Sequence, residues 1–600
     1  MTKVDRGPNE QPPIFAPDMK VRAPRKKWWR ILKGLGIGVL GVLLICAALA
    51  AWWVPRHGEA WLDNALRERI AETIDQASVE GYHFRMDSLR TDVKTGSVSV
   101  TGVQLDFAPE LMDSLRSGAF QYLFDASAER IEMRGLSFWR LLWKKEFRVS
   151  SFSISGPTFN YLIGGERINL KEPFARLNRR KKSMAVTLLT ADTVRVFKAA
   201  ATVQDLGDRL PDMQVSGLDL VGHGVRVFMG AFRNGVRLSV TGAELQLDGM
   251  HTQLADGAAL SVGRVELSLS ERNGIVRDFR HVAARRDSLN SEGLPNTQLM
   301  VALDSLMLSG LEVDELIAHQ VLHVGHIHVI GLQMEAALDK TLPMAPRTPK
   351  VLPPAALLGV RFPIKVDTVT VQNARLIYRE RDDETERWGE VPFGHLNGQF
   401  LGITNEPGAI QVTPEVSGTL TAMMFDKAPI ELTYTAALNG SQNFVINAVV
   451  TDLPAVVLNA VTRPLGRLQM DAGQLKRMYL HMEGDERKAH GKLALNYTDL
   501  KARVEPGTPR EQYNSMLGTI VETMLKEPYG GGMEADRERN FNIDRDPDRA
   551  LTAYLWHATR EGLVRNLSPE VVDRMKQMLR VDAERRRAKR ARRRATKEGE

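Results

Sequence analysis

The sequence predicts a mainly β protein: an elongated, curved and repetitive antiparallel β-sheet that forms an open apolar groove, with an N-terminal transmembrane helix and C-terminal helices. Three observations predict this architecture. Residues 34–54 are uncharged and apolar, an eight-residue strand pattern recurs through the body, and helical periodicity returns after about residue 506. At 600 residues the chain exceeds the roughly 250–300 over which one compact core grows, which favours an extended architecture or several domains.

Residues 34–54 form the first expected element, a transmembrane helix. At ~1.5 Å per residue, this segment spans the roughly 30 Å of a hydrocarbon core. Tryptophan pairs at 28–29 and 52–53 flank it as interfacial aromatic belts do, and the N-terminal flank is rich in Lys and Arg. This asymmetry predicts a cytoplasmic N-terminus, with the rest of the chain across the membrane. Cleavage of a signal peptide at Ala48-Leu49-Ala50 is the alternative.

The body repeats an octet of the form apolar-x-apolar-x-Gly-apolar-x-apolar. The apolar residues occupy odd positions of the octet before the glycine and even positions after it. In a straight strand, the two apolar pairs would therefore point to opposite faces of the sheet. A bulge or tight turn at the glycine returns them to one face, and Asn is the next residue to tolerate the required positive φ. Full matches occur at 98–105, 131–138, 213–220, 238–245, 306–313 and 327–334, and variants occur at 152–159 and at 369–376, where Asn373 replaces the glycine.

The octets supply the candidate groove residues. Few long helices are expected between residues 90 and 505, so an apolar sheet face there would lie uncovered, and such a face marks a ligand or membrane site. The candidates lie two residues before each octet glycine, and the positions after the glycine are an equal alternative. They are Val100, Met133, Val215, Val240, Leu308 and Val329.

Composition and periodicity divide the chain into eight segments. Five prolines between 343 and 354 mark a linker, and Asn439-Gly440 predicts a hairpin turn between two strands. The segments are a basic tail (1–33), the transmembrane helix (34–54), an amphipathic helix (55–80), an N-terminal repetitive β-groove (81–338), a Pro-rich linker (339–361), a C-terminal β-groove segment (362–505), a helical region (506–582) and an Arg-rich tail (583–600).

The net charge of +7 comes from the two ends of the chain. Residues 1–33 carry +6 and residues 585–600 carry +7, so residues 34–584 sum to −6. A mildly acidic body argues against a basic groove for DNA or RNA. Cys46 is the only cysteine, which excludes a disulfide framework and a cysteine-based zinc site.

No residue pattern indicates an enzyme. The sequence contains no nucleophile elbow, P-loop or zinc-protease motif, so we assign no catalytic residue and no cofactor. Four histidines lie between 319 and 328. Strand alternation puts His323 on the face opposite His326 and His328, so we expect no metal site there.

The Arg-rich tail is the densest charge feature. It is either a solvated helix end or a site for the phosphates of anionic lipids. Its cations are Arg585, Arg586, Arg587, Lys589, Arg590, Arg592, Arg593 and Arg594.

Four passages resemble the AsmA-like family of the AsmA/TamB-like repeating β-groove superfamily. They are residues 82–89, residues 362–378, residues 391–396 with 403–405, and residues 490–500. The resemblance implies an inner-membrane anchor that bears a long curved sheet with a concave apolar groove for lipid acyl chains. The family provides no catalytic residue to transfer, and the Arg-rich end departs from its pattern.

Together these observations predict a non-enzymatic, single-pass inner-membrane protein whose bulk is periplasmic. We expect it to support phospholipid transport to the outer membrane, or the assembly and integrity of that membrane. Its expected partners are phospholipids or other envelope lipids, the inner membrane, and outer-membrane or envelope proteins, but no nucleic acid. The alternative is an anchored scaffold that positions envelope assembly machinery and binds no lipid.

Overall fold

The computed structural model describes the central part of the chain. The expected transmembrane helix, the amphipathic helix 55–80 and the Arg-rich tail lie outside this part. No helix that the structure describes is both long and apolar enough to cross a membrane. The described residues are 82–92, 95–117, 122–136, 146–164, 188–206, 212–228, 237–254, 257–284, 297–319, 321–342, 349–360, 362–383, 385–466, 468–504 and 537–566.

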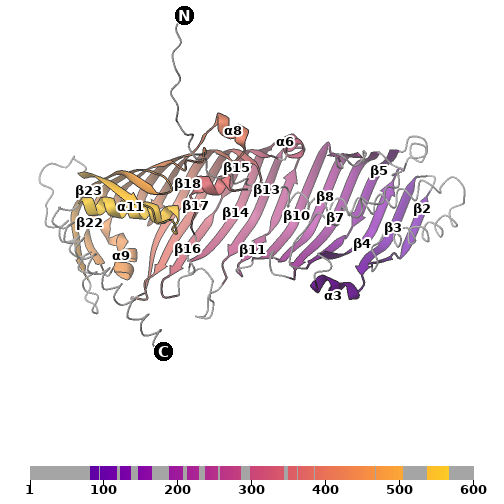
Figure 1. The fold of residues 1–600 in the computed structure, drawn as a ribbon, viewed down its shortest axis with the longest axis horizontal. Helices are drawn as coiled ribbons and strands as arrows, with labels where there is room; N and C mark the ends of the chain where they lie inside the picture. The colour runs from indigo at the N-terminus through magenta and orange to yellow at the C-terminus, as the bar shows by residue number, and fades with distance from the viewer. Residues whose placement is uncertain are drawn as a thin grey trace, which may run out of the picture.

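All described strands belong to one sheet, and Figure 1 shows them side by side along the long axis of the molecule. This confirms the prediction of an elongated, repetitive, mainly β fold. The first half contains β1 (Tyr82–Arg85), β2 (Ser88–Asp92), β3 (Ser97–Phe107), β4 (Tyr122–Arg134), β5 (Glu146–Ser155), β6 (Thr158–Ile163), β7 (Leu188–Asp205), β8 (Asp212–Phe228), β9 (Arg237–Ser239), β10 (Gly242–Gln253), β11 (Ala259–Val262) and β12 (Arg264–Ser268).

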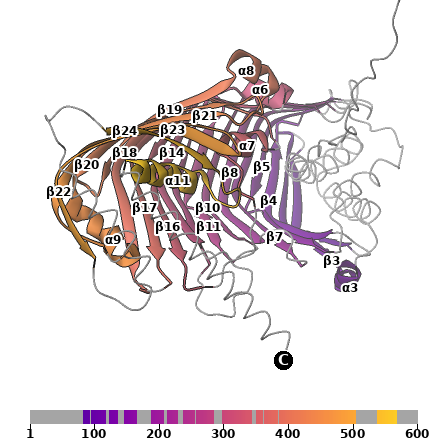
Figure 2. The ribbon, with the colours of Figure 1, turned by 60° about the vertical axis from the view of Figure 1, so that its left-hand side comes forward.

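The second half of the sheet bends at its C-terminal end, where the last strands fold over (Figure 2). Its strands are β13 (Asn273–Val282), β14 (Thr297–Leu311), β15 (Leu322–Ile330), β16 (Gln333–Asp339), β17 (Ile364–Arg381), β18 (Trp388–Thr404), β19 (Glu415–Met424), β20 (Ala428–Ala437), β21 (Phe444–Pro454), β22 (Leu468–Gly484), β23 (Lys488–Val504) and β24 (Arg537–Asp544). The described helices are α3 (Glu110–Arg116), α6 (Val313–Ala318), α7 (Pro353–Leu358), α8 (Pro407–Val412), η1 (Ala455–Leu458), α9 (Asn459–Gly466) and α11 (Leu551–Arg565).

The sheet is antiparallel except at two joins, which the sequence did not predict. β5 and β6 pair with β7 in parallel, and β15 and β16 pair with β17 in parallel. Parallel neighbours need a connection that returns the chain to the other end of the strands. The Pro-rich segment 339–361 lies in the second of these connections, so the sheet is continuous across it. Pro353 occupies a first-turn position of α7 within this segment, where proline is favoured.

The octet glycines have the positive φ that the sequence argument requires. The values are +61° at Gly102, +69° at Gly135, +58° at Gly156, +63° at Gly217, +69° at Gly310 and +66° at Gly331. Asn373, which replaces glycine in its octet, has φ +50°. Gly242 is the exception: it begins β10 without a positive φ, and the positive value falls on Gly224 in the neighbouring strand.

These kinked residues lie on two lines that cross the sheet, which we call the first and second creases. Along the first crease, Lys198 (φ +53°) donates its backbone N–H to Asp219 Oδ1 at 2.6 Å, and Asn373 donates to Asn397 Oδ1 at 3.0 Å. Gly102, Gly156, Gly217 and Gly331 lie on it too. The second crease passes through Gly135, Gly224, Gly310, Gly325 and Gly402.

The two creases are about six residues apart along each strand. In β15 and β16 they lie at Gly325 and Gly331, and in β17 they lie at Asp367 and Asn373. We call the part of the sheet between them the central strip. The central strip accounts for the octet pattern, because each octet glycine lies at an edge of the strip. The apolar residues on one side of that glycine therefore fall within the strip.

Apolar side chains on both sides of a crease share one face, as the parity argument predicts. Val324 and Ile327 flank Gly325, and Val366 and Val369 flank Asp367. All four belong to one hydrophobic cluster with Leu311. A simple strand would put residues three apart on opposite faces, so the kink has reversed the alternation.

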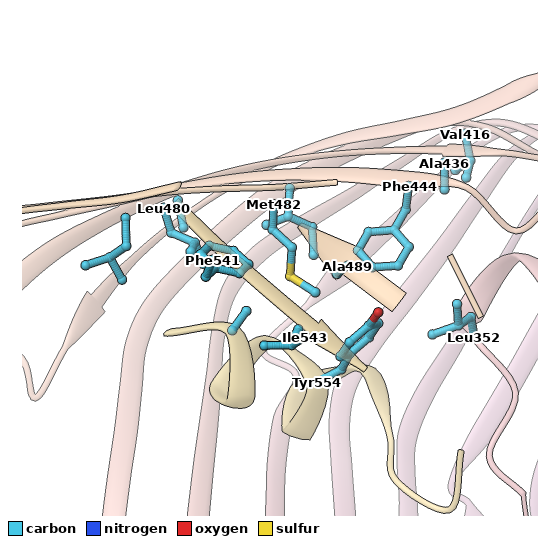
Figure 3. Packing of buried hydrophobic residues seen from close by; sticks show 14 of the residues in the cluster. Leu352, Val416, Ala436, Phe444, Leu480, Met482, Ala489, Phe541, Ile543 and Tyr554 are labelled. Atoms are coloured by element: carbon cyan, nitrogen blue, oxygen red, sulfur yellow. The ribbon is translucent and has the colours of Figure 1, made fainter. Parts of the chain in front are cut away.

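The C-terminal end contains an extensive hydrophobic cluster, in which α7 and α11 pack on the bent sheet (Figure 3). The ring of Tyr554 meets that of Phe444 edge-on, with centroids 6.0 Å apart. Leu352, which precedes α7, is fully buried there, and Lys350 donates its N–H to Pro547 O at 2.8 Å. α11 lies within the region 506–582 that was expected to be helical, and its Ala558 is buried in the cluster. β24 was not expected, because residues 506–582 read as helical.

Candidate functional site

One face of the central strip carries a continuous row of apolar side chains. Each member lies directly opposite the next one on the neighbouring strand, so the row crosses the sheet without interruption. Such cross-strand pairs stabilise a sheet and cover its backbone with hydrocarbon. The row is Val100, Ile131, Ile154, Val196, Leu220, Leu245, Leu267, Gly274, Leu308, Ile327, Val369 and Phe400.

A second apolar row runs beside the first in the middle of the sheet. Its members occupy the same face because they lie two residues away along each strand. They are Leu247, Val265, Val276, Leu306, Val329 and Val371. The two rows together make a broad apolar surface between the creases.

The exposure of this apolar face changes along the sheet. At the N-terminal end Val100 is 3% exposed and Met133 is 1% exposed. At the C-terminal end Met482 and Leu493 are fully buried beneath α11. Between these ends, the row side chains of β7 to β18 are half-buried, and Gly274, which has no side chain, is buried. Neighbours on the same sheet cover the flanks of such side chains and leave their tips accessible.

The described helices leave the middle of the apolar face uncovered. Of the helices that the structure describes, α3 packs on β4, α6 on β15, α7 on β18, α9 on β17, β18 and β22, and α11 on β23 and β24. None of them packs extensively against β7 to β14. From β7 to β14 the first apolar row crosses six strands (β7, β8, β10, β12, β13 and β14), which at ~4.8 Å each make a surface roughly 29 Å long.

The six candidate groove residues do not form a single row. Val100 and Met133 lie at the buried end, whereas Leu308 and Val329 lie in the half-buried middle. Val215 lies beyond the first crease, opposite Met250. Val240 lies beyond the second crease. Its side chain is still close to the strip, because a Cβ added at Gly222, which lies within the strip, would be 3.8 Å from Cγ1 of Val240.

Strand direction explains this division. The octet glycine marks the end of the central strip in some strands and its beginning in others. In β8 the strip follows Gly217, so Leu218 and Leu220, not Val215, lie within it. For this octet, the positions after the glycine are the ones that lie within the strip. A sequence pattern that is symmetric about the glycine contains no signal to distinguish the two cases.

The continuation of the first row meets a buried tyrosine at the C-terminal end. Phe400 is followed by Gly418, Tyr434, Ile446 and Met482. Burial raises the pKa of Tyr434 to about 12, so this side chain is neutral at physiological pH. Its hydroxyl is buried and has no hydrogen-bond partner among the described residues. The apolar face thus stays uncharged up to the point where α11 closes it.

The histidine cluster is arranged differently from the sequence prediction. The crease at Gly325 reverses the alternation, so His323 lies on the same face as His326, away from Val324 and Ile327. Each histidine has its own partner: His323 Nε2 lies 3.1 Å from Asp367 Oδ2, and His326 Nε2 lies 2.8 Å from Thr370 Oγ1. In the described ranges, no three His, Cys, Asp or Glu residues could hold a metal ion together.

The sequence was also compared with known proteins. No family model matches it, and no curated protein matches it.

Proposed function

We propose that this protein is an inner-membrane-anchored envelope protein whose apolar face holds lipid acyl chains. In this proposal it supports phospholipid transport to the outer membrane, or the assembly and integrity of that membrane. The observation that carries the proposal is the uninterrupted apolar row from Val100 to Phe400, half-buried and free of described helices in its middle. A large uncovered apolar surface is typical of ligand or membrane sites.

The dimensions of this surface suit a lipid. Its length of roughly 29 Å exceeds the ~15 Å depth of one leaflet, half of a ~30 Å hydrocarbon core. The two adjacent rows offer hydrocarbon contact over a width of several residues. The uncharged segment 34–54 supports the anchor, and the passages similar to AsmA-like proteins support the envelope setting.

The test is lipid retention by the purified full chain. We expect phospholipid to copurify with the wild type after detergent exchange, as measured by mass spectrometry. Leu308→Glu should leave the protein folded but remove bound lipid, because a carboxylate in an apolar channel costs several kcal/mol once acyl chains surround it.

A matched control lies one residue away. Met307 belongs to the same strand, points to the opposite face and is 45% exposed. Met307→Glu should therefore retain lipid. Equal lipid content in both variants, or no lipid in the wild type, would contradict the proposal. Either result would favour the anchored scaffold, in which the sheet positions envelope machinery and never holds lipid.

A further inference from the structure

The face opposite the apolar rows carries an uncharged polar row in the C-terminal half of the sheet. Its residues alternate with those of the apolar rows along each strand, so they point to the other side. Each lies directly opposite the next on the neighbouring strand. From β15 to β22 the row is His328, Thr370, Gln399, Thr419, Thr433, Asn447 and His481, and we call it the polar track.

The polar track contains no Asp, Glu, Lys or Arg. Toward the N-terminus the same cross-strand line continues through Met307 and Ile275 to Glu266, and then through Gln246 to Asp219. Toward the C-terminus it reaches Lys492. In a protein with 26% charged residues, seven consecutive members without Asp, Glu, Lys or Arg form a local chemical environment of their own.

A hollow of about 520 Å³ lies over the middle of this track. The side chains that line it include His328, Thr370, Gln399 and Thr419, together with Asn397 and Thr421 from the adjoining line. Gln399, Thr419 and Thr421 are exposed, and their side chains make no hydrogen bond to any residue that the structure describes. These amide and hydroxyl groups are therefore available to a ligand.

Neighbouring hydrogen bonds hold other members of the track in place. His328 Nε2 lies 3.0 Å from Gln372 Oε1, which orients the histidine at one end of the hollow. Further along, Asn447 Nδ2 donates to Thr433 Oγ1 at 3.1 Å, and Asn447 Oδ1 lies 2.7 Å from His481 Nδ1. A pre-ordered row loses less side-chain entropy when a ligand binds.

We propose that the polar track binds a neutral glycan chain. Amide, hydroxyl and imidazole groups match the hydroxyl and acetamido groups of sugars, and an uncharged row favours an uncharged ligand over an anionic polymer. The track repeats its side chains at the strand spacing of ~4.8 Å, which is close to the length of one pyranose ring in an extended chain. Seven strands give room for several consecutive sugars.

The test is binding of chitopentaose and cellopentaose to the full chain by isothermal titration calorimetry. At least one of these neutral oligosaccharides should bind, with little dependence on salt because no ion pair forms. The double variant Gln399→Ala/Thr419→Val should weaken the affinity at least tenfold, since it removes the two free groups in the middle of the hollow.

The matched control is Thr193→Val, a threonine on the same face in β7 and outside the polar track, which should leave the affinity unchanged. Leu308→Glu should also leave it unchanged, so loss of lipid and loss of glycan binding are distinguishable. No binding of either oligosaccharide, an equal loss in Thr193→Val, or unchanged affinity in the double variant would each overturn the proposal. Oligosaccharide binding that disappears with salt would also overturn the proposal, because contacts that involve no ion pair are little affected by screening.

Discussion

The backbone N–H of Asn373 in β17 donates a hydrogen bond to Oδ1 of Asn397 in β18 over 3.0 Å. Asn373 lies on the first crease with φ +50°, and the register between the two strands shifts beside it. The Asn397 amide thus satisfies a donor that the kinked backbone turns away from the regular ladder. This pair shows how the sheet accommodates a crease without glycine.

Substitutions at Asn373 should separate backbone strain from side-chain loss. We expect Asn373→Val to lower the free energy of unfolding by roughly 1–3 kcal/mol, because a β-branched residue resists positive φ. Asn373→Gly should change it by much less. Urea unfolding of the two variants measures the difference, with Thr368→Val in the same strand as the control. Equal destabilisation by Val and Gly would mean that φ is not the cause.

Glutamate at the buried N-terminal end of the apolar face and glutamate in its half-buried middle should have different consequences. Met133 is 1% exposed, so Met133→Glu places a carboxylate where no water reaches it, and the N-terminal part of the sheet should unfold. Val329 is half-buried, so the carboxylate of Val329→Glu stays hydrated and the fold should persist. Circular dichroism and limited proteolysis check both variants. A folded Met133→Glu protein would show that its end of the sheet is open.

The stability of the protein should fall at alkaline pH. The pKa of Tyr434 rises from 10.0 to about 12 on folding because the ring is buried. Between these values the unfolded chain loses the proton first, so ionisation favours unfolding and the free energy of unfolding decreases as pH rises. Tyr434→Phe should reduce this slope and cost little near neutral pH, because the hydroxyl lacks a described partner. Denaturation midpoints near pH 8 and pH 11 test this.

The Arg-rich tail should act through charge alone. Deleting residues 583–600 should leave the sheet folded, since this segment has few apolar residues to bury. If the tail binds phosphates, the deletion should weaken binding to anionic liposomes at low salt and have little effect at high salt. Liposome co-sedimentation measures this. Identical binding with and without the tail would favour the solvated helix end.

The orientation in the membrane follows from the basic flank of residues 34–54. A reporter that is active only outside the cytoplasm should be active when it is fused after residue 600, because Lys and Arg hold residues 1–33 inside. The same reporter at residue 1 should be inactive. The reverse pattern would contradict both the orientation and the envelope setting of the proposed function.

Sequence reasoning predicted the local features of the fold well. The octet required a backbone kink, and the positive φ values at Gly102, Gly331 and Asn373 provide it. The hairpin around Asn439-Gly440 is confirmed by the pairing of β20 with β21. Each of these features depends on residues within a few positions of one another, so a short pattern contains the necessary information.

Long-range features were missing from those predictions. β24 has only Phe541 and Ile543 as buried apolar residues, and it is a strand because β23 pairs with it. The two parallel joins depend on where the chain returns, which no local pattern records. Val215 fell outside the central strip for the same reason.

The sequence by itself therefore determined where the strands bend and which side chains are apolar, because positive φ and hydrophobicity are properties of single residues. The tertiary structure decided which apolar side chains meet, which of them are covered, and which polar side chains align into a row. These outcomes depend on strand order and direction, which are set by hydrogen bonds between segments far apart in the chain.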